Sequence, residues 1–406
     1  MGDVYRFEDC QVDPRQFELR RGGDVVHVEP QVFALLIHLI RHRHRVVAKN
    51  ELLDAVWGGR YISDSALTSR VKMLRRALGD DGHQQRVIAT VHGIGYRFVA
   101  EVAELDNDTV DAVGEPGIFR PPQQIRYCVS PDGVRVAYAI SGTGSPLVRA
   151  ANWLTHLDLE WSSPIWAHWL DGLAHHHRLI RYDERGCGLS DWEVADFSFD
   201  AWVNDLELVV NAVGLDRFPL LGVSQGGAVA IAYAVRHPER VSRLVLVSGY
   251  CRGRLARART ADEREEAALD LQLGRIGWRH ADPTFRQVFA SQFLPDGSRA
   301  LWDAFNDLQR ATTSTENVVR FLDVFARIDV STQAPHVRCP TLILHNRDDL
   351  RVPRAQAQEL AALIPDSELV FLPSRNHILT AGEPAWPLFL TEIDRFLAAG
   401  PAQPNT

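Results

Sequence analysis

Residues 218–236 read FPLLGVSQGGAVAIAYAVR. The first six residues form an apolar run of strand length, and the last nine have the composition of a helix. Between them, Gly222, Ser224 and Gly226 form the pattern G-x-S-x-G, whose glycines let the chain turn sharply and project the serine from the end of the strand. The stretch therefore predicts a nucleophilic Ser224, with the backbone N–H of Gln225 directed at a developing oxyanion.

The same stretch contains the longest uncharged run of the chain, 18 residues from Phe218 to Val235. This length is at the lower limit for a membrane-spanning helix. A lipid-facing helix would rarely collect a serine, a glutamine and three glycines at its centre, so we interpret the run as strand, turn and helix. The N-terminal residues MGDVYRFEDC are acidic and lack an apolar segment, which argues against a secretory signal. We expect a cytoplasmic protein with no membrane partner.

A serine hydroxyl is a weak nucleophile at neutral pH, so Ser224 needs a base and a carboxylate that orients the base. Two downstream segments carry the required groups, because residues 345–353 read HNRDDLRVP and residues 373–377 read PSRNH. Each segment follows an apolar run of strand type. The candidates are His377 as the base and either Asp348 or Asp349 as its partner.

Residues from about 125 to 400 alternate short apolar runs with helical stretches. This rhythm is typical of a mostly parallel, doubly wound sheet with helices on both faces. The runs are Pro146–Ala151, Arg178–Tyr182, Phe218–Val223, Leu244–Val247, Thr341–His345 and Leu369–Leu372. The fold class predicted for this segment is therefore α/β.

These features together resemble the α/β-hydrolase superfamily. The chain order serine, aspartate, histidine is the order of that superfamily. Its usual pattern G-x-x-D-x-x-x-P falls on Asn346–Pro353, which selects Asp349 over Asp348. The loop RYDERGCGLSD at residues 181–191 is also similar to the loop after strand four in that superfamily. The resemblance implies a catalytic triad of Ser224, Asp349 and His377.

The resemblance also implies a second oxyanion donor. In that superfamily His-Gly-x commonly follows strand three, and its last residue supplies a backbone N–H. Here residues 150–153 read AANW, so the donor would be the backbone N–H of Trp153. Asn152 replaces the glycine, and we expect it to adopt the unusual backbone that glycine would provide.

A helical lid is implied at about residues 250–337, over the active site. Its first part contains four arginines: Arg252, Arg254, Arg257 and Arg259. They could receive an anionic ligand. The favoured alternative is an exposed helix on which they pair with acidic neighbours. Those neighbours are Asp262, Glu263, Glu265 and Glu266.

The N-terminal segment differs from the rest of the chain in charge. Residues 1–100 contain 15 Lys+Arg and 12 Asp+Glu, a net charge of +3, whereas the whole chain of 406 residues has −8. Such an excess of cations is a weak sign of a nucleic-acid-binding module. After short alternating runs, three helices are predicted, at Gln31–Arg41, Lys49–Val56 and Ser63–Leu78. A β-hairpin that turns at Gly93 and Gly95 closes the segment.

The third of these helices has one apolar stripe, formed by Leu67, Val71, Leu74 and Leu78. Its opposite face presents short polar and cationic side chains, a combination that suits the major groove of B-DNA. These residues are Thr68, Ser69, Lys72, Arg75 and Arg76, with Arg70 flanking them. From the hairpin, His92 and Arg97 could contact the DNA backbone or the minor groove.

Residues 4–100 resemble the winged-helix DNA-binding domain of the OmpR/PhoB type. The closing run TVHGIGYRF at residues 90–98 is the most specific part of this resemblance, together with RVKMLRRAL at residues 70–78. That family usually carries a receiver domain before the winged helix, and here only three residues precede Val4. We therefore expect the input signal to enter elsewhere in the chain.

The predicted organisation is a winged-helix domain at residues 1–100, a linker at 101–124 rich in acidic residues, proline and glycine, and a hydrolase domain at 125–400. The five cysteines are too widely spaced for a zinc knuckle or a redox pair. Histidines 175–177 are interpreted as a solvated helix end rather than a metal site. We expect neither a cofactor nor a metal ion.

Two functions remain open. The favoured one is a transcriptional regulator that binds promoter DNA as a homodimer and whose hydrolase domain senses or turns over a small molecule. The alternative is a serine hydrolase of esterase or lactonase type, in which the winged helix tethers the enzyme or contacts a protein such as RNA polymerase.

Overall fold

The computed structural model of the chain divides into two compact units, Met1–Glu115 and Pro116–Thr406. The structure describes residues 4–13, 18–26, 28, 30–57, 64–80, 84–91, 93–105, 123–279 and 284–398. Within these residues, no helix is both long and apolar enough to span a lipid bilayer. Each unit has a hydrophobic core of its own.

The first unit combines helices with two antiparallel sheets, whose strand orders over the described residues are β4-β3-β2-β1-β8 and β5-β7-β6. The strands are β1 (Val4–Phe7), β2 (Cys10–Asp13), β3 (Glu18–Arg21), β4 (Asp24–Val25), β5 (Val47–Ala48), β6 (Ile88–Val91), β7 (Gly95–Phe98) and β8 (Ala103–Leu105). The helices are α1 (Pro30–Arg41), α2 (Lys49–Trp57) and α3 (Asp64–Leu78). This order of strands, helices and closing hairpin is the predicted winged helix-turn-helix.

Helix α3 packs on this unit through the predicted apolar stripe. Leu67, Val71, Leu74 and Leu78 are all buried in the core that α1 and the sheets share. Because residues spaced three and four apart lie on one face of a helix, the stripe leaves the opposite face to the solvent. The structure confirms the helix and its buried face.

The closing hairpin depends on one glycine. Strand β7 pairs with β5 so closely that a Cβ at Gly95 would lie 2.0 Å from the carbonyl oxygen of Val47. Any side chain there would push the two strands apart. Gly95 therefore permits the contact that attaches the hairpin to the start of α2.

The second unit is built on a sheet of eight strands within its described residues, in the order β16-β15-β14-β13-β11-β12-β10-β9. Strands β9 and β10 are antiparallel at one edge, and the other strands run parallel. The bounds are β9 (Gln124–Val129), β10 (Arg135–Ser141), β11 (Ser145–Arg149), β12 (His177–Tyr182), β13 (Phe218–Val223), β14 (Val241–Val247), β15 (Thr341–Asn346) and β16 (Ser367–Leu372). The predicted α/β class is confirmed.

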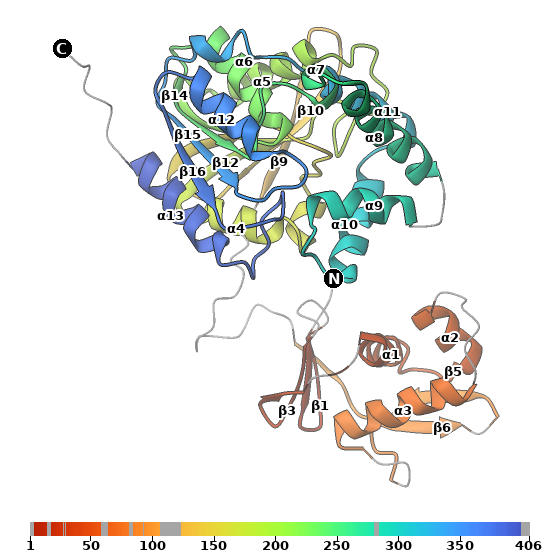
Figure 1. Cartoon of the computed structure of the whole chain (residues 1–406). Helices are drawn as coiled ribbons and strands as arrows, with labels where there is room; N and C mark the ends of the chain where they lie inside the picture. The colour runs from red at the N-terminus through yellow and green to blue at the C-terminus, as the bar shows by residue number, and fades with distance from the viewer. Residues whose placement is uncertain are drawn as a thin grey trace. The chain divides into compact units, whose positions relative to one another are not determined.

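Helices flank this sheet, and a further group is inserted between β14 and β15 (Figure 1). The flanking helices are α4 (Ala167–His176), α5 (Phe199–Val213), α6 (Gln225–Arg236), α12 (Arg354–Leu363) and α13 (Ala385–Ala398). The inserted helices are α7 (Arg254–Arg257), α8 (Ala261–Arg279), α9 (Thr284–Phe293), α10 (Arg299–Thr312) and α11 (Thr315–Arg327). They occupy the segment in which we predicted a lid.

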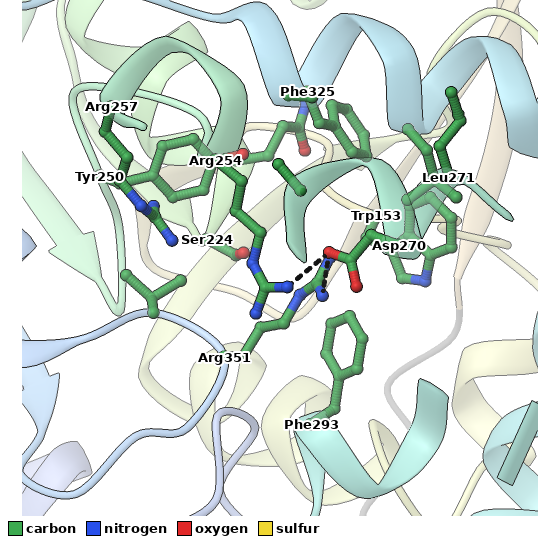
Figure 2. A pocket seen from close by; sticks show the side chains of 15 residues that line it. Trp153, Ser224, Tyr250, Arg254, Arg257, Asp270, Leu271, Phe293, Phe325 and Arg351 are labelled. Carbon is green, nitrogen blue, oxygen red and sulfur yellow. Dashed lines mark hydrogen bonds and ion pairs between the residues drawn. The ribbon is translucent and has the colours of Figure 1, made fainter. Parts of the chain in front are cut away.

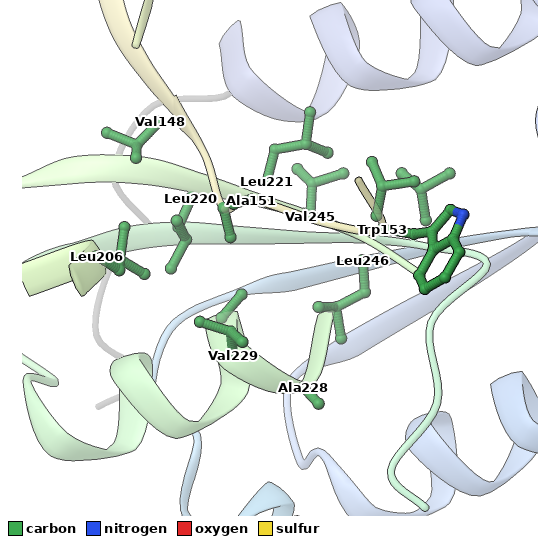
Figure 3. Packing of buried hydrophobic residues seen from close by; sticks show 14 of the residues in the cluster. Val148, Ala151, Trp153, Leu206, Leu220, Leu221, Ala228, Val229, Val245 and Leu246 are labelled. Carbon is green, nitrogen blue, oxygen red and sulfur yellow. The ribbon is translucent and has the colours of Figure 1, made fainter. Parts of the chain in front are cut away.

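The central strands are buried on both faces, as their unbroken apolar sequences predict. Leu220 and Leu221 of β13 lie between Val148 of β11 and Val245 of β14, and Val229 of α6 covers one side (Figure 3). This packing fixes the end of β13 and the start of α6.

The predicted linker at 101–124 overlaps described strands at both of its ends. Ala103–Leu105 form β8, which pairs with β1 and so belongs to the first unit. Strand β9 already begins at Gln124. The sequence here lacks a clear period-two pattern, and β8 forms by pairing with β1, a strand about 100 residues away. Residues 106–122 lie outside the described part of the chain.

Candidate active site and nucleic-acid interface

Ser224 occupies the turn between β13 and α6 with a strained backbone, at φ 53° and ψ −124°. A Cβ at Gly222 would lie 2.6 Å from the Cα of Gly227, and a Cβ at Gly226 would lie 2.7 Å from the carbonyl oxygen of Ala151. Larger residues would therefore collide with backbone atoms at both positions. The G-x-S-x-G spacing follows from the close approach of α6 to β13 and to the loop after β11.

Three predicted side chains meet at this turn. His377 Nε2 lies 2.9 Å from Ser224 Oγ, and His377 Nδ1 lies 2.7 Å from Asp349 Oδ2. The side chains of His377 and Asp349 are 1% and 0% exposed. With the carboxylate on Nδ1, the imidazole presents Nε2 as a proton acceptor to the serine hydroxyl.

Asp349 is held by the loop that follows β15. Its Oδ1 accepts hydrogen bonds from the backbone N–H groups of Arg351 at 2.8 Å and Val352 at 2.9 Å, which leaves Oδ2 for His377. Burial opposes ionisation of this carboxyl, but the neighbouring His377 and the hydrogen bonds bring its pKa below the ordinary value. Asp348 is exposed, so the structure gives the role of histidine partner to Asp349.

His377 is fixed from two sides. Its backbone N–H donates to the carbonyl oxygen of Phe293 at 2.7 Å, and the Phe293 ring lies edge-on to the imidazole with 5.5 Å between centroids. Asn346 Nδ2 donates to the carbonyl oxygens of Asn376 at 2.7 Å and His377 at 3.2 Å. Because Phe293 ends α9, the inserted helices touch the candidate base directly.

Gln225 and Trp153, the two predicted oxyanion residues, both line the cavity at Ser224. Gln225 is the first residue of α6, where backbone N–H groups and the helix dipole favour a negative charge. Trp153 is fixed by its indole N–H, which donates to Gln309 Oε1 at 2.7 Å. The positive-φ backbone in its loop belongs to Leu154, at φ 46°. The expectation for Asn152 is wrong, because its φ is not positive. Its side chain accepts a hydrogen bond from Arg149.

A buried glutamate behind the turn was not predicted. Gln225 Nε2 donates to Glu184 Oε1 at 2.9 Å. Burial raises the pKa of Glu184 to about 8, so this carboxyl is mostly protonated at neutral pH. Its position inside the loop at residues 181–191 was visible in the sequence, but a loop glutamate is usually solvated.

On the first unit, α3 exposes most of the predicted DNA-binding residues. Thr68, Ser69, Lys72 and Arg76 are exposed, and Arg97 is exposed on β7. Arg70 is half-buried and donates to Met73 Sδ at 3.3 Å. These groups form a polar and cationic surface opposite the buried stripe, with spacing that suits phosphate and base contacts.

Arg75 differs from this prediction. Its Nη2 donates to the carbonyl oxygen of Ile88 at 2.7 Å and to Thr90 Oγ1 at 2.8 Å, so the guanidinium joins α3 to β6. The helical period places Arg75 beside Arg76, but β6 packs against that edge of the helix. His92 lies outside the described residues.

Two family models match the chain. Residues 154–383 match the α/β hydrolase fold, and residues 23–98 match the C-terminal domain of transcriptional regulatory proteins. The chain belongs to the α/β hydrolase fold family. Its N-terminal part is a DNA-binding domain of the OmpR/PhoB type.

Curated relatives and solved structures resemble the second unit. "Putative carbamate hydrolase RutD" from Agrobacterium fabrum is 28% identical over 239 residues, covering 58% of this chain and 88% of that protein. The protein of the same name from Shigella flexneri serotype X is 30% identical over 223 residues, covering 54% and 82%. The esterase RhEst1 from Rhodococcus sp. ECU1013 superposes with a TM-score of 0.54 and 25% identity, covering 68% of this chain and 98% of that one.

The arginines at the start of the insertion do not form the predicted pairs. Arg254 Nη1 donates to Asp270 Oδ2 at 2.9 Å, and Arg252 pairs with Glu359. Within residues 123–279, none of the four predicted acidic partners forms an ion pair with these arginines. Glu263 instead accepts a hydrogen bond from the backbone N–H of Arg259. The exposed-helix interpretation is therefore wrong, because α7 turns Arg254 and Arg257 toward the cavity at Ser224.

One group of described residues could hold a metal ion, although we expected none. His38 of α1, His42 just after α1 and Glu51 of α2 place one ligand atom each within 4.8 Å of one another. Hydrogen bonds from Arg45 hold the pKa of Glu51 at about 2, so this carboxylate already has a cationic partner. A metal ion would have to displace Arg45.

Proposed function

We propose that this protein is a DNA-binding transcriptional regulator whose α/β-hydrolase domain binds and turns over a small acyl compound at Ser224. The observation that carries the proposal is the continuous contact from Asp349 through His377 to Ser224, on the same chain as a DNA-binding domain. We take the second unit as the ligand-responsive domain and infer a cytoplasmic location, where promoter DNA is accessible.

The geometry supports acyl transfer. Ser224 Oγ attacks the carbonyl carbon of an ester or lactone while its proton passes to His377 Nε2. Asp349 stabilises the imidazolium that forms, and the backbone N–H groups of Gln225 and Trp153 stabilise the oxyanion. His377 then returns the proton to the leaving oxygen. A water molecule, deprotonated by His377, hydrolyses the acyl-serine and releases the acid.

The cavity at Ser224 suits a small acyl group. It measures about 50 Å³, and a single water molecule needs roughly 10–15 Å³ on this scale. Trp153, Phe293, Leu322 and Phe325 supply its apolar wall.

For DNA, we propose that α3 enters the major groove with Thr68 and Ser69 toward the bases, while Arg70, Lys72 and Arg76 contact phosphates. Arg97 would contact the backbone beside the hairpin. Two copies on paired half-sites would form a homodimer on double-stranded promoter DNA.

Fluorophosphonate labelling of the full chain tests the catalytic part. We expect one labelled serine, loss of labelling in Ser224→Ala, and hydrolysis of p-nitrophenyl hexanoate by the wild type alone. If wild type and Ser224→Ala were equally inert toward the probe and the ester, Ser224 would have no nucleophilic role.

A second candidate function is a serine hydrolase in which the winged helix serves as a tether or contacts RNA polymerase. The hydrogen bonds that link Asp349, His377 and Ser224 favour it. Selection of binding sites from a random pool of duplex DNA separates the two. An enriched sequence motif supports a regulator, and the absence of any motif at physiological salt supports a tethered enzyme.

A further inference from the structure

The cavity at Ser224 is lined by more cationic than anionic side chains. Three arginines, Arg254, Arg257 and Arg351, line it together with a single carboxylate, Asp270. The arginines come from α7 and from the loop after β15, and Asp270 comes from α8. Figure 2 shows the guanidinium groups of Arg254 and Arg351 meeting at Asp270 beside Ser224. The formal charge of the lining is +2.

Asp270 cannot balance all three cations. Its Oδ2 accepts from Arg254 at 2.9 Å and from Arg351 at 2.7 Å, so two guanidinium groups share one carboxylate oxygen. Asp270 is 8% exposed and Arg351 is 14% exposed, so water screens these charges little.

Arg257 makes no ion pair with a carboxylate of the described residues, although Asp270 and Glu359 favour its charged form from farther away. Across residues 123–279 and 284–398, no carboxylate lies within ion-pair distance of it, and its Nη1 donates only to the carbonyl oxygen of Arg252, at 3.3 Å. Burial lowers the pKa of Arg257 below the ordinary value. A desolvated cation without a counter-ion is unfavourable unless a ligand supplies the missing charge.

Two of the three arginines also line a second cavity. A larger, more open cavity is also lined by Arg254 and Arg257, and it adds Arg252 and Arg259 together with three glutamates, Glu263, Glu266 and Glu359. The two arginines therefore stand where the cavities adjoin. The formal charge of this second lining is +1, so the larger excess of positive charge, and the stronger attraction for an anion, lies in the cavity at Ser224.

We propose that the acyl compound handled at Ser224 carries a carboxylate on its acyl side, bound by Arg257 together with Arg254 and Arg351. The inference rests on the proposed function and names the substrate class of that site. A carboxylate matches the forked geometry of a guanidinium, and it is a small anion that suits a cavity of about 50 Å³. Neutral acyl groups of the same length would leave Arg257 uncompensated.

In the reaction with such an ester, Ser224 Oγ bonds to the ester carbonyl carbon and the bond to the leaving alcohol breaks. His377 carries the serine proton to the departing oxygen. Water then cleaves the acyl-serine, and the product is a dicarboxylate. The carboxylate held by the arginines takes no part in bond changes and positions the acyl chain.

Three p-nitrophenyl esters of equal acyl length test the proposal with the full chain. They are the mono-adipate, which is anionic, the hexanoate, which is neutral, and the 6-aminohexanoate, which is cationic. We expect kcat/KM, after subtraction of the uncatalysed rate, to fall in that order, with at least about a tenfold preference for the adipate over the hexanoate. Ten- to hundredfold is the range for one charge-assisted hydrogen-bonded pair.

Variants identify the source of the preference. Arg257→Met should reduce the adipate-to-hexanoate ratio by about tenfold, and Arg257→Lys should retain part of it because the charge remains. Arg264→Met is the matched control, since Arg264 is an exposed arginine on α8 outside both cavities. It should leave the ratio unchanged.

Failure of this inference differs from failure of the proposed function. Serine-dependent hydrolysis without any preference for the adipate overturns the anionic ligand and leaves the hydrolase. If none of the esters is hydrolysed, calorimetric titration of adipate into Ser224→Ala decides the matter. Binding that weakens in Arg257→Met supports the carboxylate site, and the absence of binding overturns it.

Discussion

In the proposed reaction, two side chains, His377 and Asp349, control the reactivity of Ser224. The strained turn presents its hydroxyl, His377 lies within hydrogen-bond distance, and Asp349 receives two backbone N–H groups that keep its second oxygen for the imidazole. None of these groups would act alone. In the proposed reaction, the serine therefore depends on three loops held at one end of the sheet.

The neighbouring aspartates provide a matched test of this arrangement. Asp349→Asn should lower kcat for p-nitrophenyl hexanoate by about a thousandfold or more, because the amide favours the wrong histidine tautomer. Asp348→Asn should leave kcat within about twofold, because Asp348 is exposed and makes no contact with His377. Steady-state kinetics checks both variants. Equal losses would show that Asp349 does not orient the base.

Glu184 should make stability depend on pH. Its pKa is raised to about 8 in the folded state from an ordinary value of 4.5. Between these two pH values the folded chain holds a proton that the unfolded chain has lost, so the free energy of unfolding falls as pH rises. Glu184→Gln removes this dependence.

Melting temperatures at pH 5, 6, 7 and 8 measure the effect. The wild type should lose more stability across this range than Glu184→Gln, which keeps an amide able to contact Gln225. Parallel curves for the two proteins would mean that the carboxyl is ionised in the fold.

The cationic side chains of α3 differ in their surroundings. Lys72 and Arg76 are exposed, whereas Arg75 ties the helix to β6 through Ile88 and Thr90. Neighbouring cations on one helix are thus expected to differ in role.

Salt dependence separates those roles. Lys72→Ala and Arg76→Ala should each weaken DNA binding and reduce the slope of log affinity against log salt by about one. Arg75→Ala should instead lower the melting temperature of the first unit. Fluorescence anisotropy over a salt series and thermal unfolding measure the two effects. A full salt slope in all three variants would place the DNA on another surface.

The elements that sequence predicted best are those with strong local patterns. The strand Phe218–Val223 and the turn at Ser224 follow from an apolar run and from glycines that cannot be replaced without a clash. The buried stripe of α3 follows from its spacing. Such features are encoded by residues close together in the chain, so they are visible without a structure.

The features that sequence reasoning missed depend on packing between distant segments. Asp270 accepts a hydrogen bond from Arg351, which lies 81 residues further along the chain, and no local pattern indicates that pair. The guanidinium of Arg75 is bonded to β6 instead of lying on the exposed face of α3. Leu154, and not Asn152, adopts a positive φ. In each case a tertiary contact overrides what the local sequence favours.

The chain joins a DNA-binding domain to the proposed hydrolase site, and a ligand-responsive regulator requires the two to influence each other. If a ligand in the cavity changes DNA affinity, DNA must change ligand affinity by the same factor. A tethered enzyme would show no such coupling.

The most direct test is the affinity of the full chain for its selected DNA site, with Ser224 free and with Ser224 labelled by a fluorophosphonate. We predict a change of about fivefold or more in Kd, the lower end of ordinary allosteric coupling. Ser224→Ala treated with the same reagent should show no change. Identical affinities for labelled and unlabelled wild type would contradict a regulator whose DNA affinity depends on the state of Ser224.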